Sequence, residues 1–297
     1  MSEAQKTTPA PHSDVQGSLY GTSNAASRSE RINPSRIRTV HLKRFKEQGQ
    51  RFAMLTSYDA MTAAVFDQAG VEVLLVGDSA ANVMMGRGST LPITTDELII
   101  FARSVVNGAH RALVVADLPF GTYEASPQQA VETAVRFMKE AGVHAVKAEG
   151  DASLAGHVRA MVSAGIPVIG HIGFTPQSEH ALGGYRVQGR GEAAEAVLAD
   201  ARAMQEAGAF AVLVEMIPAE VMAEVDAALE VPTIGIGAGA AATGQVLVWQ
   251  DMLGLGDGKS PRFVKKYADL RTVMTEAVTA YREDVLEGRF PGEEHTF

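Results

Sequence analysis

The stretch VEVLLVGDSA, residues 71–80, is a short aliphatic run that stops at a glycine, an acid and a hydroxyl. A run of this length, rich in Val and Leu, predicts a β-strand that is buried on both faces. The same pattern recurs as ALVVADLP (112–119), HAVKAEG (144–150) and AFAVLVEM (209–216). The four runs lead to Asp78, Asp117, Glu149 and Glu215. Four buried strands that present acids at their carboxyl ends indicate a functional site.

From residue 36 onward, aliphatic runs alternate with Ala-rich stretches of helical period. We expect eight strands, at 51–59, 71–79, 112–119, 144–150, 167–173, 209–216, 232–239 and 245–251. A helical stretch is expected after each strand, for example at 60–69, 126–141, 192–207 and 263–286. Gly142 and Gly208 follow two of these stretches, at the position where a left-handed helix cap is needed.

Eight βα units predict an α/β fold of the (β/α)8 barrel type. The alternative is a doubly wound open sheet, which would have fewer strands and a glycine-rich loop after the first strand. The turn at that position is SYDAMTAA (57–64), which contains no glycine. The barrel is therefore favoured, and its active site is expected at the carboxyl ends of the strands.

Residues 1–35 differ in composition from the remainder of the chain. They are rich in Ser, Thr, Ala and Pro and contain almost no large aliphatic residues. Such a segment buries too little apolar surface to offset the loss of chain entropy. We expect a disordered N-terminal tail over residues 1–35 and a single barrel domain over residues 36–297.

Composition excludes several classes of protein. The 297 residues are 46% hydrophobic and carry a formal charge of -9 without a block of Lys and Arg, so no nucleic-acid partner is expected. The absence of cysteine rules out disulfides and thiolate metal sites and fits a cytoplasmic protein. No apolar run approaches the roughly 20 residues of a membrane span, and the N-terminus lacks the apolar core of a signal peptide.

Each acid at a strand end has an alternative interpretation as a helix cap or a turn residue. Glu is a poor cap, however, and two of the four acids are Glu. Lys147 and Glu149 are two residues apart on one strand, so their side chains face the same side. They form either a simple ion pair or part of a pocket. Because desolvation makes a buried ion pair a weak source of stability, the pocket is favoured.

Carboxylates without cysteine or paired histidines suit Mg²⁺, which prefers oxygen ligands. Asp78 and Asp117, on neighbouring strands, are the leading candidate ligands, and Glu149 is the third. Zn²⁺ is disfavoured because no H-x-x-x-H or H-x-H spacing occurs. Glu215 shares its strand face with Ala211 and Leu213, and an apolar setting raises the pKa of a carboxylate. We expect Glu215 to be a general base, unless an Arg or Lys pairs with it.

Two glycine-rich segments remain. GIGAGAAATG (235–244) lacks the lysine and the spacing of a P-loop, so a tight turn or a close approach to a ligand explains it equally well. The polar segment 170–191 after the fifth strand is long for a loop, which is typical of functional or disordered segments. His171, at its start, is either a ligand contact or a structural histidine.

Ten motifs occur in order along about residues 36–297, namely LLVGDS, STLPI, VVADLPFGTYE, VKAEG, GHIGFTPQS, GGYRVQGRG, VLVEM, IGIGAG, GQVLVWQDMLG and PGEEHTF. Together they resemble the motifs of the 3-methyl-2-oxobutanoate (ketopantoate) hydroxymethyltransferase family. Members of this family are (β/α)8 barrels that bind Mg²⁺ and form homo-oligomers, often large rings. They transfer a one-carbon unit from 5,10-methylenetetrahydrofolate to a small oxo-acid through a Mg²⁺-stabilised enolate, in pantothenate biosynthesis.

The resemblance implies a role for each matching position. Asp78 and Asp117 would hold the metal and, with Ser79 and Lys147, bind the oxo-acid. Glu149 would complete the surroundings of the metal, and Glu215 would be the catalytic base. These are the acids that the strand pattern had already indicated.

The sequence departs from the family pattern at two places. Arg87-Gly88 stands where an aromatic residue or His is usually followed by Asp, and Glu179-His180 replaces a more apolar or amide pair. Two other functions remain as alternatives. The first is another Mg²⁺-dependent lyase or mutase that forms an enolate from an oxo-acid, although such enzymes commonly use a Cys that this chain lacks. The second is a catalytically inactive barrel with a binding or structural role.

Overall fold

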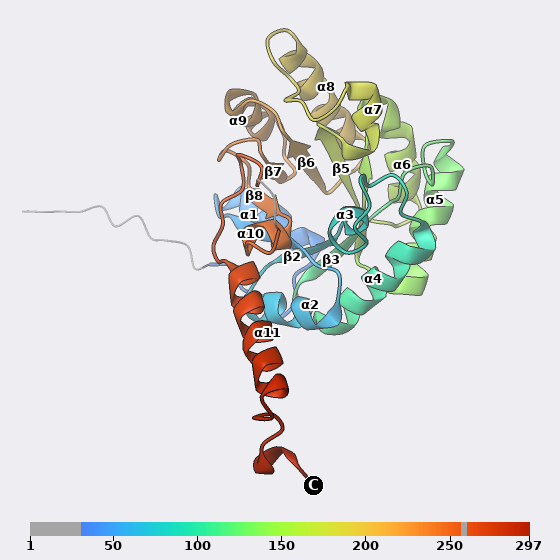
Figure 1. Cartoon of the computed structure of the whole chain (residues 1–297). Coiled ribbons are helices and arrows are strands. Elements are labelled where there is room, and N and C mark those ends of the chain that lie inside the picture. Colours follow the sequence, from blue (N-terminus) through green and yellow to red (C-terminus); the bar gives the residue numbers. More distant parts are fainter. Residues whose placement is uncertain (1–30, 257–259) are drawn as a thin grey trace, which may run out of the picture. The chain divides into compact units, whose positions relative to one another are not determined.

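Eight parallel strands close into a barrel in chain order, from β1 to β8 (Figure 1). The computed structural model describes residues 31–256 and 260–297. The strands are Phe52–Thr56 (β1), Val73–Val76 (β2), Leu113–Asp117 (β3), Ala145–Glu149 (β4), Val168–Gly173 (β5), Ala211–Glu215 (β6), Thr233–Ile236 (β7) and Gly244–Leu247 (β8). Each strand pairs with the next, and β8 pairs with β1. The predicted (β/α)8 architecture is confirmed.

All eight expected strands are present, but each is shorter than predicted, and the end of the last prediction falls in a helix. β8 ends at Leu247, and Trp249–Met252 form a short helix, α10, so the expectation of a strand up to residue 251 was wrong. At this turn the backbone N–H of Trp249 donates to Thr56 Oγ1 (3.0 Å) instead of continuing the strand. The indole then packs in the apolar layer, with its ring 6.1 Å from that of Phe66.

Helices follow most of the strands, and several of them pack on the outside of the barrel, whereas the last one, Leu270–Leu286, has no buried residue (Figure 1). They are α2 (Ala60–Gln68), α3 (Ala80–Val83), α4 (Thr95–Gly108), α5 (Pro127–Arg136), α6 (Ala155–Ser163), α7 (Glu179–Leu182), α8 (Ala193–Glu206), α9 (Ala219–Ala228) and α11 (Leu270–Leu286). One π-helical turn, Phe137–Ala141, extends α5, and short 3₁₀ turns lie at Ala152–Leu154, Pro176–Ser178 and Glu293–His295. Gly142 and Gly208 have φ of 76° and 97°, which confirms the two predicted left-handed caps.

Two helix predictions need correction. Residues 237–243, all described, connect β7 to β8 without a helix, so the expectation of a helix after every strand was wrong. Glycines and alanines dominate this connection, and such a sequence allows a tight path along the barrel wall. The helix expected at 263–286 begins only at Leu270, where the Asp269 side chain accepts a hydrogen bond from the Thr272 N–H (3.3 Å).

The core has two layers. Inward-facing residues of the strands, among them Met54, Leu75 and Val115, fill the barrel, and a larger set packs between the strands and the helices. Helix α1 (Thr39–Glu47) adds Leu42 and Phe45 to the inner layer. The Phe45 ring lies 5.7 Å from that of Phe52, the first residue of β1, so α1 covers the amino-terminal end of the barrel. The carboxyl ends of the strands are left for the site.

The predicted N-terminal tail falls mostly on residues 1–30, which lie outside the described residues. The chain divides into two units, Met1–Arg31 and Ile32–Phe297, and the second holds the whole barrel. Within that second unit, the Ile32 N–H donates to Gln50 Oε1 (3.0 Å), and Ile37 is only 1% exposed. None of the helices in the described part of the chain is both long and apolar enough to cross a membrane.

Candidate active site

Strand register brings the acidic side chains together at one end of the barrel. Asp117 pairs with Lys147, and Glu149 pairs with His171. Val76 pairs with Ala116, which places the turn after β2 beside the end of β3. The Asp78 N–H donates to Asp117 Oδ2 (2.9 Å) and joins the two acids directly. Aliphatic strands that end on acids therefore converge, as the sequence pattern indicated.

A cavity of about 290 Å³ lies at this end of the barrel. All six residues singled out from the sequence line it, namely Asp78, Ser79, Asp117, Lys147, Glu149 and Glu215. Its remaining wall is largely apolar and includes Leu75, Leu213, Ile236, Val246 and Phe263. The arrangement therefore combines a charged floor with apolar sides in a space suited to a small ligand.

Lys147 is the cation at the centre of the charged floor. Its Nζ lies 3.1 Å from Asp117 Oδ1 and 3.1 Å from Glu149 Oε1, and all three side chains are buried. Although burial disfavours the charged amine, Asp117, Glu149 and Asp78 raise the pKa of Lys147. Lys147 is therefore held charged, and the predicted shared orientation of Lys147 and Glu149 is observed.

The three carboxyl groups around Lys147 have pKa values that are shifted in different directions. Burial, together with the charges of Glu149 and Asp117, raises the pKa of Asp78 to about 8. Burial also raises the pKa of Asp117, against the opposing effect of Lys147. Burial acts on Glu149 in the same sense, but Lys147 and His171 lower the pKa of that carboxyl to about 2. One lysine does not neutralise the cluster.

The donor set at this floor fits a hard divalent cation. Asp78, Asp117 and Glu149 each offer a carboxylate oxygen, and these oxygens lie within 4.8 Å of one another. Asp117 Oδ1 is buried and accepts no hydrogen bond from any described residue, although Lys147 lies near it as an ion-pair partner. Oxygen ligands and uncompensated negative charge are what Mg²⁺ requires.

Glu215 lies at the end of β6, on the far side of His171 from Glu149. Its side chain is 13% exposed, and Oε2 is 3.4 Å from His171 Nε2. His171 Nδ1 lies 3.2 Å from Glu149 Oε1 and 3.1 Å from Lys147 Nζ. His171 is therefore packed between the predicted base and the acidic cluster. Its Nε2 is buried without a hydrogen bond to the described residues, so it can meet a ligand in the cavity.

Ser79 is fixed by an aromatic neighbour. Its Oγ is 2.8 Å from the Tyr58 hydroxyl, and Tyr58 is 1% exposed. The Ser79 side chain caps no helix, although Ser79 precedes α3. Its hydroxyl is held at the cavity wall, and the family resemblance implies that it contacts the oxo-acid there.

Two residues of the site were missed by the sequence analysis, Gln177 and Tyr123. Gln177 Nε2 donates to Asp78 Oδ2 (2.9 Å), and the Gln177 N–H donates to Glu149 Oε2 (3.1 Å). The Tyr123 hydroxyl donates to Gln177 Oε1 (2.6 Å). Both residues lie in connections between elements, where no periodic pattern marks them. The long polar segment 170–191 was the only sequence signal for Gln177.

Comparison with known proteins identifies the family. A family model described as ketopantoate hydroxymethyltransferase matches residues 36–293. The chain belongs to this family.

Curated members of the ketopantoate hydroxymethyltransferase family are similar to this chain over most of its length. The chain is 62% identical over 283 residues to 3-methyl-2-oxobutanoate hydroxymethyltransferase of Paenarthrobacter aurescens (strain TC1), with 94% of each protein covered. It is 62% identical over 263 residues to the protein of that name from Arthrobacter sp. (strain FB24), with 89% of this chain and 87% of the relative covered. The chain is thus a member of an enzyme family of hydroxymethyltransferases, as the motifs predicted.

Solved structures share the fold of this hydroxymethyltransferase. The phosphoenolpyruvate phosphomutase of Streptomyces platensis subsp. rosaceus superposes with a TM-score of 0.57 at 17% identity, over 87% of this chain and 91% of that one. At this identity the likeness shows the barrel fold and nothing about the reaction.

The departure from the family pattern at Arg87 has a local structural role. Its guanidinium donates to Glu97 and to the Pro92 carbonyl oxygen (3.0 Å). Glu97 and Thr94 form the capping box that begins α4. Arg87 therefore ties the segment after α3 to the start of α4, on the side of the cavity that Asn82, Val83 and Thr90 line.

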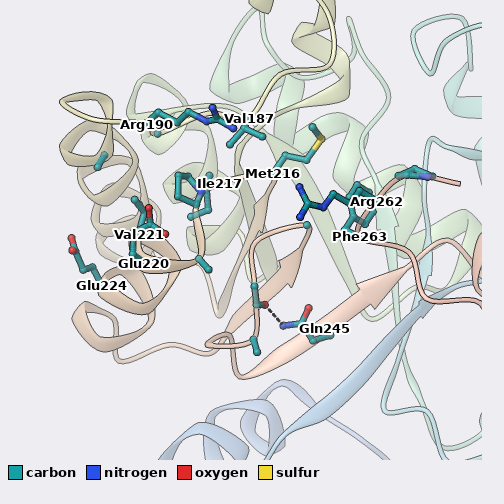
Figure 2. Close-up of a pocket in the computed structure, with 18 of the residues that line it drawn as sticks. Val187, Arg190, Met216, Ile217, Glu220, Val221, Glu224, Gln245, Arg262 and Phe263 are labelled. Carbon is teal, nitrogen blue, oxygen red and sulfur yellow. Dashed lines mark hydrogen bonds between the residues drawn. The ribbon is translucent and has the colours of Figure 1, made fainter.

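A second hollow of this hydroxymethyltransferase lies beside the cavity. It is a groove of about 1480 Å³ that shares Pro261 and Phe263 with the cavity. Figure 2 shows Glu220 and Glu224 of α9 on one wall, and Arg262 and Phe263 on the other. The glycine-rich connection from β7 to β8 forms one side of the groove. The Gly239 carbonyl oxygen accepts a hydrogen bond from Gln245 Nε2 (2.9 Å). The missing helix after β7 leaves this space open.

Proposed function

We propose that this protein transfers a hydroxymethyl group from 5,10-methylenetetrahydrofolate to 3-methyl-2-oxobutanoate, which gives 2-dehydropantoate (ketopantoate) for pantothenate and coenzyme A biosynthesis. The names of the relatives support the acceptor and the product. The observation that carries the proposal is the cavity of about 290 Å³, which is lined by three clustered acids, one lysine and Glu215.

In this proposal Asp78 and Asp117 hold Mg²⁺, and Glu149 completes the surroundings of the ion. Both Glu149 oxygens already accept hydrogen bonds, whereas Asp117 Oδ1 does not. The two aspartates are therefore the better direct ligands. When bound, Mg²⁺ would act as a Lewis acid toward the oxo-acid and acidify the C–H bond next to its carbonyl group.

The chain itself orients the oxo-acid. Lys147 adds a fixed positive charge where negative charge develops during the reaction. The Ser79 hydroxyl, held by Tyr58, contacts the polar end of the substrate. Leu213, Ile236 and Val246 form an apolar wall that accommodates the branched alkyl group. A small oxo-acid with an aliphatic end matches both halves of the cavity.

Glu215 is the base that removes the proton from C3 of the oxo-acid. The resulting carbon nucleophile forms a C–C bond to the methylene carbon, and the C–N bonds from that carbon to tetrahydrofolate break. Water supplies the hydroxyl group, so one oxo-acid, one methylene donor and one water give the product and tetrahydrofolate. The donor carries the one-carbon chemistry, and the protein supplies position and charge.

The donor is far larger than the oxo-acid, and a cavity of about 290 Å³ does not hold both molecules. We propose that the body of the donor lies in the adjoining groove of about 1480 Å³. Phe263 lines both spaces, and the exposed cations Arg190 and Arg262 suit the carboxylates of a folate tail.

A homo-oligomer in the cytoplasm remains our expectation from the family resemblance and the cysteine-free composition.

Proton exchange tests the function. The protein, Mg²⁺ and 3-methyl-2-oxobutanoate are placed in D₂O without the donor, and loss of the C3 proton signal is followed by NMR. We expect exchange that depends on Mg²⁺ and that falls by about 10²–10⁴-fold in Glu215→Gln. Exchange that persists unchanged in this variant would remove Glu215 from its role. No exchange in the wild type, with or without donor, would reject this acceptor and leave an enolate-forming reaction on another oxo-acid as the alternative.

The donor position is tested separately, by calorimetric titration with tetrahydrofolate. Arg190→Glu is expected to weaken binding of tetrahydrofolate and to leave the proton exchange unchanged. Arg202→Glu, an exposed change on α8, is the matched control and should alter neither measurement. Equal affinity in both variants would place the donor elsewhere without affecting the assignment of the acceptor site.

A further inference from the structure

Gln177 occupies a position that its residue type alone does not explain. It lies in the 3₁₀ turn Pro176–Ser178 after β5, and it is only 6% exposed. A buried glutamine amide is costly unless each of its polar atoms finds a partner. All of the partners of Gln177 belong to the acidic cluster or to the connections around it.

The partners fix the orientation of the amide. Nε2 lies 2.9 Å from Asp78 Oδ2 and 3.0 Å from the Leu118 carbonyl oxygen. Because a carbonyl oxygen can only accept a hydrogen bond, the amide nitrogen must point toward Leu118 and Asp78. Oε1 then needs a donor, and the Tyr123 hydroxyl lies 2.6 Å away. The Tyr123 hydroxyl in turn accepts from the Glu149 N–H (3.1 Å), and Tyr123 is 1% exposed.

This chain of hydrogen bonds controls which oxygens face the cavity. The side-chain amide of Gln177 donates to Asp78 Oδ2, whereas Asp78 Oδ1 receives no hydrogen bond from the described residues. The backbone N–H of Gln177 donates to Glu149 Oε2 (3.1 Å). Gln177 thus fixes the orientation of two carboxylates, one in the turn after β2 and one at the end of β4. Because it is neutral, it adds donors to the cluster without adding charge.

We propose that Gln177, held by Tyr123, is a positioning residue that orients the Asp78 and Glu149 carboxylates for a divalent cation. The inference rests on the proposed metal site and extends it to two residues that bind neither metal nor substrate. Partners that orient metal ligands typically contribute about 10–100-fold to metal affinity. The loss of Gln177 should therefore appear first in cation binding.

Titration with Mg²⁺ alone, followed by calorimetry, tests the proposal. Gln177→Met keeps the length of the side chain and the backbone N–H but removes the amide, and we expect the Kd for Mg²⁺ to rise by about 10–100-fold. Gln250→Met is the matched control, because Gln250 is also 6% exposed but its Nε2 donates to Met84 Sδ (3.5 Å), outside the acidic cluster. It should bind Mg²⁺ as the wild type does.

A second variant and a second readout separate positioning from a merely structural role. Tyr123→Phe removes the donor to the amide and should weaken Mg²⁺ binding in the same direction but by less. At saturating Mg²⁺, C3 proton exchange by Gln177→Met should return to the wild-type rate, because only the affinity is impaired. Should Gln177→Met not fold, Tyr123→Phe alone decides the question.

The possible outcomes distinguish the two proposals. If the wild type binds Mg²⁺ and both variants bind it equally well, the role of Gln177 is overturned and the metal site stands. If the exchange rate of Gln177→Met stays low at saturating Mg²⁺, Gln177 does more than set affinity and the positioning role is wrong. If the wild type does not bind Mg²⁺, the proposed metal site fails and the inference fails with it.

Discussion

At the scale of single residues, the site concentrates more acidic groups than its one lysine can pair with. Asp78, Asp117 and Glu149 are buried around one lysine. Buried ion pairs seldom stabilise a fold relative to a packed apolar core, because their desolvation cost is large. The cluster is therefore better explained by ligand binding than by stability.

The raised pKa of Asp78 predicts a pH dependence for the proposed binding of Mg²⁺. Burial, Glu149 and Asp117 raise this pKa from 3.8 to about 8, so the folded protein without metal keeps a proton that the unfolded chain loses. The free protein is therefore stabilised by this group at low pH and loses that stability as the pH rises through about 8. In the proposed metal site, Mg²⁺ would have to displace the same proton.

We expect the affinity for Mg²⁺ to rise by about tenfold per pH unit up to about pH 8 and then to level off. Calorimetric titrations at several pH values measure this slope. Asp200→Asn is the control, since the pKa of Asp200 is also raised by burial but its carboxylate accepts from the Ala152 N–H (2.9 Å) outside the cavity. A Kd that does not change with pH would contradict the assignment of Asp78 as a ligand.

The sequence located the charged residues of the site but not their neutral partners. The charged residues lie at or near the carboxyl ends of aliphatic strands, where the active site of a (β/α)8 barrel is expected. This rule locates Asp78, Asp117, Lys147, Glu149 and Glu215 from the sequence. Gln177 and Tyr123 reach the cluster from irregular connections. Their contacts depend on backbone geometry that no residue spacing specifies, and only the structure shows them.

At the scale of elements, the connection from β7 to β8 is the largest departure from the regular barrel. Strand patterns and helical periods predicted the other units because each element buries a continuous apolar face. Residues 237–243 carry no such face, and the run of glycines and alanines there could be interpreted either as a turn or as a ligand loop. The structure shows a close-packed crossover that also forms one side of the groove.

This crossover should tolerate substitution poorly. Gly239 has φ of 86°, and a Cβ at this position would lie 2.6 Å from Ala219 Cβ at the start of α9. We expect Gly239→Ala to destabilise the protein by about 1–3 kcal/mol, through backbone strain and crowding. Urea unfolding measures the change. Gly88→Ala, where a Cβ meets nothing within 4 Å, is the control and should be neutral or slightly stabilising. Equal stability of the two variants would show that the crossover can move away from α9.

At the scale of the whole molecule, α11 is a helix that the described part of its own chain leaves largely uncovered. The sequence predicted a barrel helix here because the segment is amphipathic, but none of its 17 residues is buried within the described part of the chain. Met274, Val278, Tyr281 and Val285 recur at helical spacing, so they form one apolar face. They are 48%, 63%, 57% and 45% exposed. A sequence cannot show whether such a face is covered by its own chain or by another.

We predict that a second copy of this chain covers the α11 face in solution, in agreement with the homo-oligomer expected from the family resemblance. A face of this kind is rare on a monomer because exposed apolar surface costs free energy in water. Light scattering after size exclusion should give a mass that is a multiple of 31.4 kDa. Val278→Glu should lower this mass, because it places a charge in the centre of the apolar face.

Thr279→Glu is the matched control, since Thr279 lies on the polar side of α11 and its substitution should leave the mass unchanged. A wild-type mass of 31.4 kDa would show that the face stays exposed in solution. A mass that Val278→Glu leaves unchanged would place the contact between copies elsewhere. Because the cavity is lined from within one chain, loss of assembly alone should leave Mg²⁺ binding by Val278→Glu measurable, so oligomerisation and the site can be tested independently.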